Sequence, residues 1–210
     1  MIQHTRLVAW VAALLLAGPI PRPEIQPDRL QKSLSQGRFA EVAQELQQIV
    51  LQTGPSLTKP APAQAKVLRG AIERTRRFLN GTHPVQDRDA ARQVLCLSRA
   101  FFPEDLPGLE QNALRVGGGV QRPEFIGKPV HRFPATAGKA RLQGVVIVEV
   151  IIDQEGCARH PRILKGLPLG ADDAALAAVQ GWTFQPATLD GKIVAVHYVL
   201  SVPFTLSDPD

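Results

Sequence analysis

One segment, residues 144–153 (GVVIVEVIID), restricts the possible folds more than any other part of the sequence. Apart from Glu149 it is apolar on both alternating faces, a pattern typical of a strand in the middle of a sheet. It also contains no proline, although the chain has 18 of them. Because proline cannot donate a hydrogen bond within a sheet, it is confined to edge strands. The segment therefore predicts a central strand, and its neighbours are expected to carry prolines.

Two segments that contain proline are predicted to flank this strand. Residues 154–156 form a turn, and residues 157–165 then give a weaker strand in which Pro161 indicates an edge. Residues 193–206 alternate most regularly between an apolar and a mixed face, and Pro203 makes this strand the other edge. The predicted order is second, first, last, with all three strands antiparallel.

A helix with small side chains is predicted before the last strand. Residues 171–180 carry alanines on one face, which lets a helix lie close to a sheet, and Gly181 is expected to end it as a left-handed cap. Trp182 and Phe184 alternate as in a short strand, so we expect both rings to pack between helix and sheet. Pro186 ends that piece. The C-terminal third thus predicts a small three-stranded antiparallel sheet with one packed helix.

Helical periodicity dominates residues 28–105. Apolar residues recur at three-to-five spacing over residues 30–49, 68–78 and 91–101, and each predicted helix must bury its apolar stripe against the others. Helices paired in this way suggest a tetratricopeptide-like hairpin, although the signature residues of that repeat are missing. The whole chain is therefore predicted to be α+β, with a helical N-terminal region followed by the sheet.

Residues 106–129 are predicted to be a linker. The three glycines at 117–119 could also be interpreted as a phosphate-binding loop, but such a loop needs a strand before it and a helix after it. The residues that follow, QRP, favour extended chain instead. The linker is therefore the better interpretation.

The N-terminus has the layout of an export signal. Residues 1–6 are positive, residues 7–17 (LVAWVAALLLA) are an unbroken apolar run, and glycine and proline follow. The run is shorter than a membrane span of about 20 residues, so cleavage and retention as an N-terminal anchor both stay open. Residues 1–27 are predicted to be a signal peptide or anchor with a Pro-rich linker, and the rest is expected to be exported.

Composition and spacing argue against several functions. The net charge is +5, but the only cluster, at residues 74–77, is better explained by a solvated helix face than by a nucleic-acid partner. The five histidines are scattered and no serine lies in a nucleophile elbow, so we expect no metal site, no cofactor and no catalytic residue. Cys96 and Cys157 could pair in an oxidising compartment or remain two unrelated thiols.

Residues from about 133 to 206 resemble the C-terminal domain of the TonB family, and we assign this domain to residues 130–208. The resemblance is carried by a set of motif residues rather than by any single one. The helical first half and the glycine-rich linker are similar to a subgroup in which a helical region precedes this domain. The motif residues, which the resemblance implies to be structural, are Phe133, Pro134, Gly144, Gly156, Trp182, Phe184, Pro186 and Gly191.

The resemblance also implies a binding mode. TonB-family members transmit energy from the inner membrane to outer-membrane transporters, and their C-terminal domain adds a transporter segment to the edge of its last strand. Pro203 has no N–H, so its side of the strand should face away from the central strand, either to receive a partner or to prevent aggregation. The residues of the same parity, which form the predicted binding edge, are Ile193, Ala195, His197, Val199 and Ser201.

The leading hypothesis is a non-enzymatic binding protein of the cell envelope. It would engage an outer-membrane transporter or another envelope protein by β-strand addition. The most specific version of this hypothesis is that the protein takes part in energy-coupled transport. Against that form, the Pro-rich segments 19–27 and 60–62 are much shorter than the family's spacer, and residues 7–17 lack the Ser-x-x-x-His pattern of its membrane helix. The alternative is a periplasmic structural adaptor whose helical half is the main docking surface.

Overall fold

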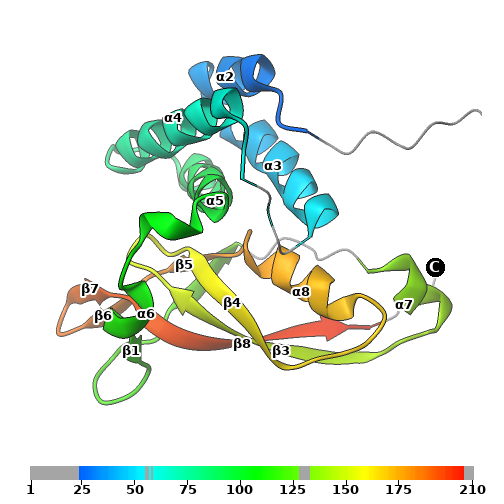
Figure 1. Ribbon diagram of the computed structural model, residues 1–210. Helices are drawn as coiled ribbons and strands as arrows, with labels where there is room; N and C mark the ends of the chain where they lie inside the picture. Colours follow the sequence, from blue (N-terminus) through cyan, green and yellow to red (C-terminus); the bar gives the residue numbers. More distant parts are fainter. Residues whose placement is uncertain (1–23, 55–56, 58, 128–132, 206–210) are drawn as a thin grey trace, which may run out of the picture.

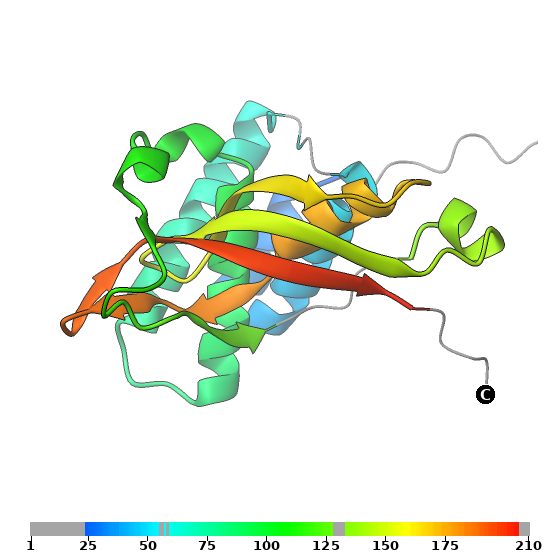
Figure 2. The ribbon, with the colours of Figure 1, turned by 90° about the horizontal axis from the view of Figure 1, so that it is seen from below.

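Helices and strands form two layers in the computed structural model, which describes residues 24–54, 57, 59–127 and 133–205. The first layer consists of the N-terminal helices, and the second consists of the main sheet with α8 (Ala171–Val179). α8 lies on the side of the sheet that faces the N-terminal helices (Figure 1). Seen from below, the sheet lies in front of the N-terminal helices, so they cover only one of its faces (Figure 2). The fold is α+β, as predicted. The helices of the first layer are α2 (Pro27–Ser35), α3 (Phe39–Thr53), α4 (Pro62–Leu79) and α5 (Val85–Ala100).

The first predicted helix is divided in two. α2 ends at Ser35 and α3 begins at Phe39. Gly37 between them has a φ of +69°, in the left-handed region that glycine adopts without strain. The expectation of one helix over residues 30–49 was therefore wrong: the apolar spacing continues across the break because both helices bury residues in one core. The likeness to a tetratricopeptide hairpin stays a prediction.

The main sheet has the strand order β1-β8-β3-β4. β3 is central and pairs antiparallel with β4 and with β8, so the predicted order of the three main strands is confirmed. Pro161 and Pro203 lie in the outer two of these strands, as their missing N–H groups require. A short parallel strand, β1, lies outside β8 and was not predicted. The strands are β1 (Leu114–Arg115), β3 (Gly144–Ile152), β4 (Ala158–Lys165) and β8 (Val196–Phe204).

The last predicted strand is also divided. Its first residues form β7 (Lys192–Val194), which pairs antiparallel with β6 (Ala187–Leu189) in a separate hairpin, and β8 starts only after Ala195. The Asp-Gly pair at 190–191 closes this hairpin with φ values of +49° and +75°, which suit a two-residue turn. Because the hairpin holds β7 in its own sheet, residues 193–206 are not one continuous strand, and that expectation was wrong.

The segment predicted to be a linker, residues 106–129, contributes to the folded structure. The ring of Phe125 lies 5.5 Å from that of Trp182 and 4.6 Å from that of Phe184. This corrects the linker prediction, because aromatic packing and main-chain pairing order a stretch whose composition indicates loose chain. Its elements are α6 (Leu109–Asn112), β1 and β2 (Glu124–Gly127), preceded by η1 (Pro103–Asp105); β2 pairs antiparallel with β5 (Thr183–Gln185).

Trp182 and Phe184 are fully buried between α8 and the main sheet, as the sequence predicts. They belong to a core that the sheet and α8 share, whereas the N-terminal helices have a core of their own. Ala177 of α8 belongs to the helical core, so α8 is buried from both sides. The main-sheet residues buried with the two rings are Val146, Val148, Val150, Ile152, Ala158, Val196, Leu200, Val202 and Phe204.

Gly181, at the end of α8, is required by space rather than by its backbone conformation. Its φ lies outside the left-handed region, so the predicted left-handed cap is wrong. A Cβ at this position would instead overlap the side-chain amide of Gln47. The glycine therefore lets α3 approach the C-terminal end of α8 closely.

Gly181→Ala is expected to lower the free energy of unfolding by about 1–3 kcal/mol, because an added methyl group in a packed site forces neighbours to shift. Chemical denaturation measures this. The matched control is Gly70→Ala on α4, where a Cβ meets nothing within 4 Å and the change should raise stability by about 0.5–1 kcal/mol. Adding Gln47→Ala to Gly181→Ala should recover most of the loss; no recovery would contradict the close contact.

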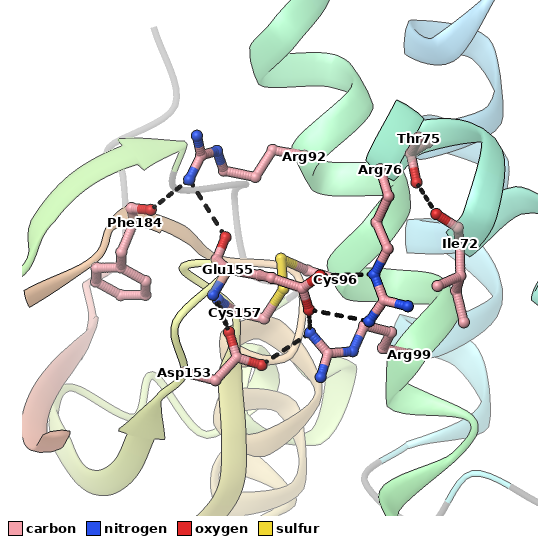
Figure 3. The surroundings of a disulfide bond; sticks show 10 residues. All are labelled: Ile72, Thr75, Arg76, Arg92, Cys96, Arg99, Asp153, Glu155, Cys157 and Phe184. Carbon is pink, nitrogen blue, oxygen red and sulfur yellow. Dashed lines mark hydrogen bonds and ion pairs between the residues drawn. A yellow bond between two sulfur atoms is a disulfide. The ribbon is translucent and has the colours of Figure 1, made fainter. Parts of the chain in front are cut away.

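A disulfide between Cys96 and Cys157 joins the two layers (Figure 3). Cys96 lies in α5 and Cys157 directly before β4, 61 residues apart, with their Cα atoms 5.1 Å from each other. Both are buried. The sequence left pairing open, and the structure decides it, because the packing of α5 on the turn between β3 and β4 brings together two cysteines that sequence spacing does not connect.

Arginines of α4 and α5 surround this disulfide and pair with the β3–β4 turn (Figure 3). Arg99 forms ion pairs with Asp153, at 3.0 Å, and with Glu155. Arg76, expected to lie on a solvated face, pairs with Glu155 at 2.7 Å, and Arg92 donates to the Glu155 carbonyl at 3.2 Å. Arg76, from the basic cluster at residues 74–77, therefore takes part in a contact between the layers.

Arg159 in β4 is buried near the same cluster. Its guanidinium donates a hydrogen bond to the carbonyl of Phe102 at 3.2 Å. Burial, and next the nearby positive charge of Arg99, lower the pKa of Arg159 to about 10. The guanidinium stays protonated at neutral pH, so it ties the end of the helical layer to the edge strand β4.

Some predictions concern residues outside the described ranges. These are the export signal or anchor at residues 7–17 and the ends of the predicted C-terminal domain, at 130–132 and 206–208. Among the helices that the structure does describe, none has the length and apolar character needed to span a membrane.

Candidate partner-binding edge

The two faces of β8 differ in burial. Val196, Leu200, Val202 and Phe204 point toward α8 and are buried. The alternate residues point to the opposite face, where Val199 is 53% exposed. The apolar and mixed faces predicted from the alternation are therefore present in β8. The strand is held on one side by the full length of β3, with Gly144 opposite Phe204 and Ile152 opposite Val196.

The backbone direction of β8 follows from two observations. Pro203 has no N–H to give to β3, and the carbonyl of Ala195 accepts a hydrogen bond from the amide of Leu114 in β1, at 2.9 Å. Both observations show that the odd-numbered residues of β8 direct their main-chain N–H and C=O groups to the outer edge, because successive residues of a strand bond to opposite sides. This direction agrees with the argument made from Pro203, while binding of a partner there stays a prediction. The residues of this parity in and next to β8 are Ala195, His197, Val199, Ser201 and Pro203.

The predicted binding edge is only partly open. Ile193 lies in β7, opposite Thr188 of β6. Ala195 and His197 face β1, whose parallel register pairs Leu114 with Val196 and Arg115 with His197. Of the five predicted residues, Val199 and Ser201 lie in the stretch of β8 that no described strand pairs with on its outer side.

The sheet face opposite α8 is partly charged beside this edge. Glu149 of β3 forms an ion pair with Arg162 of β4, and Arg115 of β1 approaches the same carboxylate at 4.0 Å. Val145 is 40% exposed, and Val199 lies directly opposite Glu149. Alternate side chains of a strand added outside β8 would therefore lie beside the apolar side chain of Val199. The ion pair of Glu149 and Arg162 borders this surface.

The described residues offer no arrangement with obvious chemical reactivity at this edge. Within them, no three or more His, Cys, Asp or Glu side chains gather as a metal site requires. His197 lies near the carbonyl of Glu110, with 3.4 Å between Nε2 and O. What the edge can offer is main-chain hydrogen bonding.

Comparison with known proteins identifies the sheet-forming part of the chain. Residues 129–206 match the family model described as Gram-negative bacterial TonB protein C-terminal. This protein carries a TonB C-terminal domain. The chain is 32% identical over 89 residues to Protein TonB of Vibrio cholerae serotype O1, a match that covers 41% of this chain and 36% of that protein. It is also similar to the solution structure of the Pseudomonas aeruginosa TonB C-terminal domain, with 21% identity, coverage of 45% of this chain and 94% of that chain, and a TM-score of 0.35.

Three of the predicted motif residues connect separate parts of the TonB C-terminal domain. Phe133 packs edge-to-face on Phe204 at 5.6 Å, which fixes the chain entering the domain against the end of β8. The amide of Phe184 donates to the carbonyl of Gly156 at 2.9 Å, so the β3–β4 turn is attached to β5. Of the others, Pro134 precedes α7 (Ala135–Lys139), Gly144 begins β3, Pro186 joins β5 to β6, and Gly191 lies in the β6–β7 turn.

Beside the TonB C-terminal domain, one feature was missed from the sequence and one was left open. Leu114 and Arg115 form β1, and two residues are too few to show alternation. The disulfide partner of Cys157 lies in the helical layer, outside the segment that the family resemblance covers. The cysteine count together with the export signal was the only available indication, and it did not decide between pairing and free thiols.

Proposed function

We propose that this protein binds a partner of the cell envelope by adding one partner strand to the outer edge of β8. The observation that carries the proposal is the stretch from Val199 to Pro203, where main-chain groups face outward and no described strand pairs with them. Main-chain hydrogen bonds give such an interface its affinity, and pockets for alternate side chains give specificity. The TonB C-terminal domain supports the same mode, because strand addition is the binding mode that its family resemblance implies.

The partner in this proposal is an outer-membrane transporter or another envelope protein, and the activity is binding rather than catalysis. A periplasmic location is supported by the Cys96–Cys157 disulfide, since such bonds persist in oxidising compartments. A more specific version of the proposal is that the protein takes part in energy-coupled transport. It depends on an anchor at residues 7–17, which lie outside the described residues.

Val199→Pro tests the edge directly. Proline removes an outward N–H without removing a hydrogen bond to β3, so the domain should stay folded while partner binding weakens by about 5–30-fold, the effect of losing roughly 1–2 kcal/mol. Binding is measured by calorimetry with 15-residue synthetic peptides tiled through the periplasm-facing segments of the outer-membrane transporters of the same organism. The peptide that binds the wild-type protein most tightly is used.

Val199→Thr is the matched control. It changes the exposed side chain but keeps the N–H and the β-branched shape, so peptide binding should change little if main-chain bonding carries the affinity. Unchanged binding by a folded Val199→Pro protein would overturn the proposal. Equal losses in both variants would assign the affinity to the side chain instead.

A further inference from the structure

The edge proposed to bind a partner is already occupied at one end by the chain itself. β1 runs parallel to β8 and pairs with Val196 and His197. The amide of Leu114 donates to the carbonyl of Ala195 at 2.9 Å. This carbonyl is one of the outward main-chain groups that continue along β8 to Pro203. A partner strand extending along β8 from Pro203 toward Ala195 would therefore meet β1 at His197.

The part of the edge left open is short. Beyond β1, the outward N–H groups are those of Val199 and Ser201, because Pro203 contributes only its carbonyl. The edge from Ala195 to Pro203 spans nine residues, and β1 leaves only the five from Val199 to Pro203 open, with two outward N–H groups. A partner that uses the whole edge needs the positions that β1 holds.

β1 is held by few contacts. It has two residue pairs, whereas β8 pairs with β3 at nine positions. Leu114 is 37% exposed, and the ion pair of Arg115 with Glu149 spans 4.0 Å with the arginine side chain 81% exposed, so it adds little stability. Residues with few buried contacts open at low free energy without unfolding the rest of the protein.

The chain on the C-terminal side of β1 is able to change direction. The three glycines at 117–119 have φ values of +137°, +58° and +92°, and no other residue type adopts such a series without strain. Val116 and Val120, at the two ends of this turn, pack against the core of the domain and are partly buried, and the next residue, Gln121, pairs with Thr188 of β6. β1 can therefore leave β8 while β2 and β3 stay in place.

We propose that β1 is an intrachain competitor for the docking edge, and that a partner strand displaces it to pair along β8 from Ala195 to Pro203. This inference rests on the proposed function, because it concerns the same edge. Displacement adds the carbonyl of Ala195 and the main-chain groups of His197 to those of Val199 and Ser201. While β1 pairs with β8, the apparent affinity for the partner equals the affinity of the open edge multiplied by the fraction of molecules whose edge is open.

A reversible cross-link between β1 and β8 tests the inference. Arg115 and His197 are register partners in adjacent strands, which lie about 4.7–4.9 Å apart, within the range that a disulfide bridges. In Arg115→Cys/His197→Cys, oxidation should lock β1 on the edge, and mild reduction should release it while the buried Cys96–Cys157 pair persists. Peptide binding should be lost in the oxidised protein and restored in the reduced one. Arg115→Ser/His197→Ser, treated in the same way, is the matched control.

Leu114→Pro tests the opposite change. It removes the N–H that bonds to Ala195, so β1 should detach and the peptide should bind about tenfold more tightly than to wild type, as expected when about a tenth of wild-type molecules have an open edge. In the protein alone, hydrogen exchange should show the His197 amide exchanging faster in Leu114→Pro than in wild type, and most slowly in the oxidised cross-linked protein.

The outcomes separate the two proposals. If the oxidised cross-linked protein binds the peptide as well as its reduced form while Val199→Pro abolishes binding, the edge is the docking site and β1 is not a competitor. If no tiled peptide binds even Leu114→Pro, the proposed function fails and this inference fails with it. Equal His197 exchange in all three proteins would also overturn the inference, whatever the peptide does.

Discussion

Removal of the Cys96–Cys157 disulfide is expected to lower the free energy of unfolding by about 4 kcal/mol, the loop-closure entropy for a bridge between residues 61 apart. The bridge joins α5 to the turn before β4, so without it the two layers depend on the packing of Ala177 in the helical core and on their ion pairs. Urea denaturation of Cys96→Ala/Cys157→Ala, followed by fluorescence of Trp182 and by far-ultraviolet circular dichroism, measures the loss in both layers.

Reduced wild-type protein is the control for this prediction, because it lacks the covalent bond but keeps both sulfur atoms in the core. The reduced protein and the double variant should lose similar stability if the constraint on the unfolded chain dominates. A loss below about 1 kcal/mol in both would contradict the entropic argument and assign the junction to its noncovalent contacts.

Trp182→Ala is expected to cost about 3–5 kcal/mol of stability, because the ring is fully buried and its removal leaves a cavity between α8 and the sheet. Partial or complete loss of the cooperative unfolding transition of the TonB C-terminal domain should follow. Thermal unfolding monitored by far-ultraviolet circular dichroism measures it.

Phe125→Ala provides the comparison within the same aromatic group. Phe125 contacts the Trp182 ring at 5.5 Å but is 49% exposed, so its removal opens the packing toward solvent and should cost clearly less than the Trp182 substitution. If both variants unfold at nearly the same temperature as wild type, the rings do not organise this core.

Proline and alternation were enough to predict the order of the three longest strands of the main sheet. Pro161 and Pro203 exclude their strands from the centre, and the proline-free segment at 144–153 must then lie between them. Burial of Trp182 was predictable for a similar reason, because a large ring after an alanine-rich helix has few other places to pack. These features depend on local pattern and on one rule of hydrogen bonding.

Other features depend on contacts between distant segments, and a single sequence does not encode them locally. Gly181 was assigned to a cap because glycine often ends helices, but the residue that requires it, Gln47, lies in another layer. β1 follows from the position that Leu114 reaches beside Ala195, not from its own two residues. The outward direction of the main-chain groups of Val199 and Ser201 was therefore predictable, while the length of the edge that β1 and β7 leave open was not.

The position of the disulfide also affects how the protein would respond to mechanical load. β1, β2 and β3 all lie between Cys96 and Cys157 in the sequence, inside a covalent loop. A pull applied between the two ends of the chain would pass through the sulfur–sulfur bond and bypass this loop. Its 61 residues, about 200 Å when fully extended, could not be drawn out, so the load would fall on β4 and β8, the neighbours of the central strand that lie outside the loop.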